Sequence, residues 1–103
     1  MNKAMTDKIY TRAELREMQL DTSAYRFPQE VGDFYAELQF KAEAHNGMLR
    51  AFFLFEDGRH ILTPIFWWQR PHGLWSLPVG RWLLLHYEYS PQGGVFLAQA
   101  QEV

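Results

Sequence analysis

The chain has 103 residues, of which 48% are apolar and 21% are charged, and its formal net charge is −2 at pH 7. This size and composition are those of a single globular domain, and they exclude a disordered, fibrous or multidomain protein. The absence of cysteine excludes disulfide bonds and cysteine-based zinc sites, and the small negative charge argues against a nucleic-acid partner. We expect one domain over residues 1–103.

Residues 1–10 mix lysine, aspartate and other polar residues and lack the apolar core of a secretory signal. No apolar run elsewhere approaches the roughly 18 residues that a membrane-spanning helix needs. We therefore expect a flexible N-terminus over residues 1–10 and a cytoplasmic protein with no membrane partner.

The first predicted element is a short helix over residues 11–20. Thr11 and Glu14 have the spacing of a capping box, in which each side chain accepts a hydrogen bond from the backbone N–H of the other residue. Leu15 and Met18 share one face, so the helix is expected to pack a narrow apolar stripe against the rest of the domain.

Residues 33–103 are predicted to form a β meander of five antiparallel strands. Apolar and polar residues alternate from residue 33 onward, as in a strand with one buried face. Asn46-Gly47 and Asp57-Gly58 favour two-residue hairpin turns, because both central residues of a type I′ turn need a positive φ. In the first hairpin such a turn places Glu43 opposite Arg50, which pairs opposite charges.

The remaining strands are predicted at residues 59–68, 81–89 and 95–101. Pro64 cannot donate to a strand ladder, so it indicates an edge, a bulge or a bend at which the meander can break. Residues 69–80 form a connection that is long for a loop without structure of its own. The fold class is therefore mainly β, a meander forming a small, partly closed barrel or a strongly curved sheet with one short N-terminal helix. The alternative is an α+β fold, with the helix packed on an open antiparallel sheet.

This register leaves large apolar side chains on both faces of the sheet. One face, with Phe53 and Phe55, is the expected core, and the opposite face carries Phe52, Leu54, Ile61, Ile65 and Trp67. One short helix is too small to cover five such side chains, so the pattern predicts a homodimer with these five residues as its interface. The alternative is that the segment with Tyr25 and Phe27, together with the loop 69–80, folds back over this face.

All four tryptophans lie between residues 67 and 82, in a part of the chain with few charges. Aromatic rings beside hydrogen-bond donors are typical of a protein or small-molecule binding surface, and the candidate residues are Trp67, Trp68, Arg70, His72, Trp75 and Arg81. Two arginines make too small a footprint for nucleic acid. The competing interpretation is that Trp68, Trp75 and Trp82 belong to the core.

His86 and Glu88 are two residues apart on a predicted strand and share a face, as an acid–base pair would. No nucleophile motif accompanies them. The histidines at positions 45, 60, 72 and 86 are not clustered, and the glycine-containing segments read as turns. We therefore expect no metal and no cofactor.

These observations predict a non-enzymatic binding or assembly module that self-associates as a homodimer through an apolar, aromatic-rich face. The alternative is a small-ligand-binding protein, because alanines leave space among rings inside the curved sheet, at Phe34, Phe40, Phe53, Phe66 and Tyr87. An enzyme that uses His86 and Glu88 is the third possibility.

Overall fold

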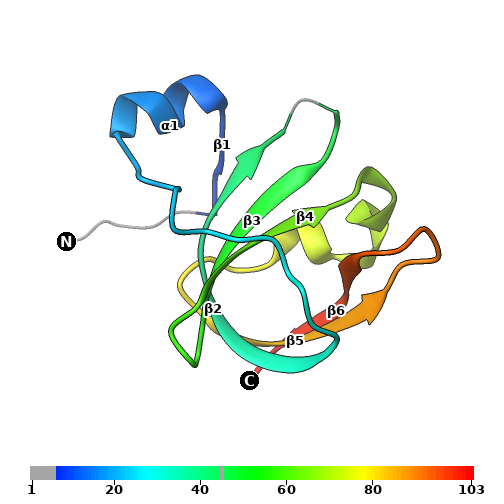
Figure 1. Cartoon of the computed structure of the whole chain (residues 1–103). Helices are drawn as coiled ribbons and strands as arrows, with labels where there is room; N and C mark the ends of the chain where they lie inside the picture. The colour runs from blue at the N-terminus through cyan, green and yellow to red at the C-terminus, as the bar shows by residue number, and fades with distance from the viewer. Residues whose placement is uncertain (1–6, 45) are drawn as a thin grey trace.

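The computed structural model describes residues 7–44 and 46–103, and their strands form one strongly curved sheet (Figure 1). This confirms the mainly β class with a curved sheet. In chain order the elements are β1 (Ile9–Tyr10), α1 (Arg12–Met18), β2 (Gly32–Glu43), β3 (Leu49–Phe55), β4 (His60–Ile65), the 3₁₀ helices η1 (Trp67–His72) and η2 (Leu74–Ser76), β5 (Trp82–Tyr89) and β6 (Val95–Glu102).

The strand order is β4-β3-β2-β5-β6, with antiparallel neighbours, and β1 pairs in parallel with β2. The predicted meander therefore breaks after β4, because β5 returns beside β2. Residues 9 and 10, predicted to be flexible, form β1. The edge strands β4 and β6 are not paired with each other, so the sheet is curved but not closed into a barrel.

The helix α1 begins with the predicted capping box. The backbone N–H of Glu14 donates to Thr11 Oγ1 (3.1 Å), and the N–H of Thr11 donates to Glu14 Oε1 (2.9 Å). Leu15 packs against the sheet, whereas Met18 is exposed. The predicted packing of this helix is therefore confirmed for Leu15 and wrong for Met18.

Both predicted hairpins are present, but each has a three-residue loop. The N–H of Ala44 donates to the carbonyl of Met48 (3.1 Å), and the N–H of Phe55 donates to the carbonyl of Arg59 (2.8 Å). In the first loop Gly47 has a φ of +76°, as glycine does at the last position of such a loop. The two-residue turns of the prediction are therefore wrong.

One extra loop residue shifts each register by one position. Glu43 lies opposite Leu49 and not Arg50, and Phe53 lies opposite Ile61. Directly opposite residues share a face, so the shift turns Ile61 toward the core. The register predicted from the sequence instead turns the residues on either side of Ile61 toward the core.

A β-bulge between Leu38 and Phe40 also reverses the alternation within β2. Before the bulge, Ala36 and Leu38 belong to the main core, whereas Phe40 and Ala42 belong to a second cluster. An inserted residue moves all later side chains of the strand to the other face. The same reversal turns Lys41 inward, where its ammonium group reaches backbone carbonyls beside η2.

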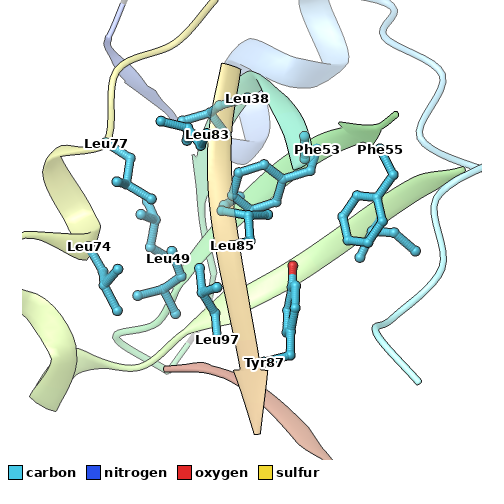
Figure 2. Packing of buried hydrophobic residues seen from close by; sticks show 14 residues of the cluster. Leu38, Leu49, Phe53, Phe55, Leu74, Leu77, Leu83, Leu85, Tyr87 and Leu97 are labelled. Carbon is cyan, nitrogen blue, oxygen red and sulfur yellow. The ribbon is translucent and has the colours of Figure 1, made fainter. Parts of the chain in front are cut away.

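The main core lies between the curved sheet and the segment that contains η1 and η2. Figure 2 shows leucines from the sheet meeting Leu74 and Leu77, with two phenylalanines and Tyr87 at the other end. The Tyr87 hydroxyl is hydrogen-bonded to the Thr63 hydroxyl (2.7 Å), so β4 and β5 are linked across the interior. Side chains thus close the gap that the strands leave open.

The second apolar face is covered by the chain itself. Phe52 is fully buried, stacks on Phe40 (4.2 Å between ring centroids) and meets Tyr25 edge-on (5.0 Å). The predicted interface is therefore wrong for Phe52, and also for Ile61 and Ile65, which the register shift places in the main core. The alternative that the chain folds back over this face is confirmed for Tyr25. It is wrong for Phe27, which is exposed, and for the loop 69–80, whose Leu74 and Leu77 pack in the main core. Leu54 is only partly buried, and Trp67 is exposed.

Candidate functional site

The tryptophan-rich segment lies on the surface of the domain. Trp67 is 68% exposed and Trp68 is 48% exposed, and the Trp68 ring stacks on Phe66 (5.8 Å) and lies near Phe96 (6.2 Å). The core interpretation is therefore wrong for Trp68 and for Trp82, which are both exposed. Trp75 is partly buried and packs against the main core.

The other candidate binding residues divide into two groups. Arg70 and His72 are exposed on η1, and the Arg70 guanidinium lies over the partly buried ring of Trp75 (5.2 Å). The indole N–H of Trp75 donates to the carbonyl of Phe66 (3.1 Å), so this ring is hydrogen-bonded to the residue that precedes η1. Arg81 directly precedes β5, is paired with Glu102 (3.6 Å) and does not join the group.

Gln69 anchors η1 to the edge strand β6, a role that no sequence signal indicated. Its side chain is 2% exposed, accepts a hydrogen bond from the N–H of Phe66 (3.0 Å) and donates to the carbonyl of Leu97 (2.6 Å). One buried amide therefore joins the end of β4 to β6, where no strand ladder does so.

A surface hollow of about 610 Å³ lies between η1 and β6. Its walls are Trp68, Gln69, His72 and Leu74 on one side and Glu88, Phe96, Ala98, Gln99 and Ala100 on the other. The hollow thus combines an exposed indole with the apolar side chains of an edge strand.

The outer edge of β6 faces this hollow. The N–H of Val103 donates to the carbonyl of Trp82 (3.4 Å), which makes these two residues a hydrogen-bonded pair across β5 and β6. Because such pairs alternate in an antiparallel ladder, Ala100 and Glu102 direct their N–H and C=O groups away from β5. Within residues 7–44 and 46–103 no other strand pairs with this edge.

His86 belongs to a polar cluster on the outer face of the sheet. Its Nδ1 lies 2.5 Å from Asp33 Oδ1 and its Nε2 lies 3.0 Å from Glu88 Oε2. Asp33 joins the predicted pair because β2 lies beside β5, which only the strand order reveals. Both ring nitrogens are engaged with carboxylates, so neither is free to accept a substrate proton in this arrangement.

The carboxylates raise the pKa of His86 above its ordinary value, with the hydrogen bond to Asp33 as the largest cause. The folded protein therefore holds this proton more tightly than the unfolded chain. The interaction stabilises the fold fully below about pH 6.5, and this stabilisation is lost as the pH rises through the folded-state pKa.

We expect Asp33→Asn to lower the pKa of His86, measured by NMR titration of its imidazole, and Glu88→Gln to lower it less. Asp57→Asn, which removes an exposed carboxylate that contacts Arg59, is the control and should leave the His86 titration unchanged. An unchanged pKa in Asp33→Asn would contradict the observed bridge.

The aromatic pocket predicted inside the sheet has little open space. Phe53 and Tyr87 belong to the main core with Phe34 packed against it, whereas Phe40 lies in the other cluster. The space beside Phe34 and Tyr87 measures about 10 Å³, the room of a single water molecule. This interior does not offer a ligand-sized cavity at that position.

Three further observations bear on the kind of protein this is. Among the described residues no group of three or more histidines and acidic residues is arranged to hold a metal ion, and His45 lies outside them. No helix of residues 7–44 and 46–103 is long and apolar enough to cross a membrane. Comparisons of the chain with protein-family models, with curated proteins and with solved structures find no match.

Proposed function

We propose that the chain is a non-enzymatic assembly module that self-associates by pairing the outer edge of β6 with the same edge of a second copy. The observation that carries this proposal is the outer edge of β6 at Ala100 and Glu102, which has no strand partner among the described residues and borders the hollow beside Trp68. Farther along the same edge, the carbonyl of Leu97 accepts from the Gln69 amide. A partner strand placed there would extend the sheet and cover the exposed face of this ring.

A second copy suits this edge because the edge is complementary to itself. Two β6 strands related by a two-fold axis run antiparallel, so the outward N–H groups of one copy meet outward carbonyls of the other. Residues 95–101 contain no charged side chain, so the two copies bring no like charges together along this stretch.

The opposite edge of the sheet is occupied by a backbone segment, whereas the bond to Leu97 on the edge of β6 comes from a side chain, that of Gln69. The N–H of Arg26 donates to the carbonyl of His60 (3.0 Å), and the carbonyl of Arg26 accepts from the N–H of Leu62 (2.8 Å). Pro64 also removes a donor from β4. Self-association by edge pairing is therefore proposed for β6 and not for β4.

The test is sedimentation velocity across about a hundredfold range of protein concentration. We expect the wild-type chain to form a dimer and Ala100→Pro to shift strongly toward the monomer, because proline removes an outward N–H without touching the ladder to β5. Circular dichroism and thermal unfolding would verify that this variant is folded.

A second variant makes the test independent of the backbone change. Gln101→Lys places a charge on an exposed position of the edge and should also weaken the dimer, whereas the same change at exposed Gln29 should not. A wild-type chain that stays monomeric throughout, or a dimer unaffected by both edge variants, would overturn the proposal.

A further inference from the structure

A second surface hollow, of about 430 Å³, lies on the outer face of the sheet and is separate from the edge of β6. It is lined by Tyr35, Glu56, Trp82 and Val103. These residues form a row across the sheet, since Glu56 follows β3 beside Tyr35 and Val103 lies opposite Trp82. The N–H of Glu56 donates to the carbonyl of Tyr35 (2.9 Å), which holds the two residues side by side at the hollow.

Both rings of this hollow are open to solvent. Tyr35 is 46% exposed and Trp82 is 45% exposed. The two side chains share a face because the register sets Tyr35 opposite Leu84, two residues from Trp82 on the same strand. Diagonal neighbours of this kind lie within reach of one another when the side chains are aromatic.

Elsewhere in the domain the aromatic rings attract the chain's own guanidinium groups. These groups lie between 5.2 and 5.8 Å from ring centroids, with Arg50 over Phe52, Arg59 over Phe34 and Phe55, and Arg70 over Trp75. No cation of the described part of the chain lies over Tyr35 or Trp82. Arg81, beside Trp82 in sequence, is paired with Glu102 (3.6 Å).

The charge around these two rings is negative. The Glu56 carboxylate is exposed and has no ion pair or hydrogen bond with the residues that the structure describes. Glu37 lies directly opposite Trp82 in the ladder and adds a second carboxylate on the same face. A cation is therefore the complementary ligand, because aromatic faces and carboxylates both attract positive charge.

We infer that this hollow binds an arginine side chain of a partner peptide. The planar guanidinium stacks on the Trp82 indole and donates two hydrogen bonds to the Glu56 carboxylate, a combination that an ammonium group does not provide. Tyr35 and Val103 pack against the aliphatic part of the arginine side chain. This inference does not depend on self-association through β6.

The test is an NMR titration with the capped tripeptide Gly-Arg-Gly, followed at the indole N–H of Trp82. The matched peptide contains citrulline, which has nearly the same shape as arginine but no charge. We expect the arginine peptide to shift the Trp82 signal and the citrulline peptide to bind about fivefold more weakly or worse. A lysine peptide should also bind more weakly than the arginine peptide.

Two variants locate the site. In these variants the titration is followed at the backbone amide of Tyr35, which all of them retain. Glu56→Gln should weaken binding of the arginine peptide about two- to fivefold, and Trp82→Leu should abolish it. Trp67→Leu, which removes another exposed indole, should leave the affinity unchanged. Equal binding of the citrulline peptide, equal binding in Glu56→Gln, or a loss caused by Trp67→Leu would overturn the inference.

Discussion

Replacement of Gln69 by leucine is expected to lower the free energy of unfolding by about 2–4 kcal/mol. Leucine fills a similar volume but forms neither of the two hydrogen bonds of the amide. The partly buried N–H of Phe66 and the buried carbonyl of Leu97 would both lose their side-chain partner. A buried polar group without a partner costs about 1–3 kcal/mol, and here one buried and one partly buried group are affected.

Thermal or denaturant unfolding of the variant measures this loss, and two further variants define its origin. Gln69→Glu keeps the acceptor for Phe66 but has no donor for Leu97, so it should also be destabilised. Gln29→Leu, the same change at an exposed position, should alter the stability by no more than about 0.5 kcal/mol. A loss below about 1 kcal/mol in Gln69→Leu would mean that the amide does not hold β6 to η1.

Lys41→Ala is expected to lower the free energy of unfolding by a comparable amount, about 2–4 kcal/mol. Lys41 is 2% exposed, and its ammonium group donates to the carbonyls of Leu77 (3.0 Å) and Trp75 (3.2 Å). Alanine removes these bonds and the packing of the four-carbon stem. The segment 74–80 would then be held to β2 by fewer contacts.

Lys41→Met separates packing from charge, because methionine keeps most of the volume and removes the buried ammonium group. We expect a smaller loss than in the alanine variant. An alanine variant as stable as the methionine variant would show that the stem contributes no packing, contrary to its burial.

The pH dependence of stability offers a second comparison between the wild-type protein and Lys41→Met. Burial lowers the pKa of Lys41, while the charge of Asp7 opposes this. The folded protein therefore binds fewer protons than the unfolded chain as the pH approaches 10.5, and wild-type stability should rise with pH there. Lys41→Met should lack this rise when both proteins are compared below about pH 10, before tyrosines ionise in the unfolded chain.

Local features of the fold could be predicted from the sequence because their causes are local. Thr11 and Glu14 satisfy N–H groups within one turn of helix, and this spacing is visible in the chain. Gly47 and Gly58 mark the last positions of the two hairpin loops, and this preference does not depend on the rest of the fold. The prediction that Phe53 and Phe55 face the core is also confirmed, because β3 contains no irregularity between them.

The candidate sites depended on relations between distant segments. The sequence marked the exposed tryptophans and the His86–Glu88 pair, but Asp33 meets His86 only because β5 returns beside β2. Tyr35 and Trp82 come together for the same reason. Neither pairing leaves a signal in the residues around it, because the strand order is set by how whole strands pack.

The sequence by itself determined a mainly β domain, its capped helix and the positions of its turns. Only the tertiary structure decided which side chains face inward, since the three-residue loops and the bulge after Leu38 each shift the alternation by one position. Such a shift costs little locally, so local sequence does not specify it. It is selected by the global packing that buries Phe52, Ile61 and the amide of Gln69.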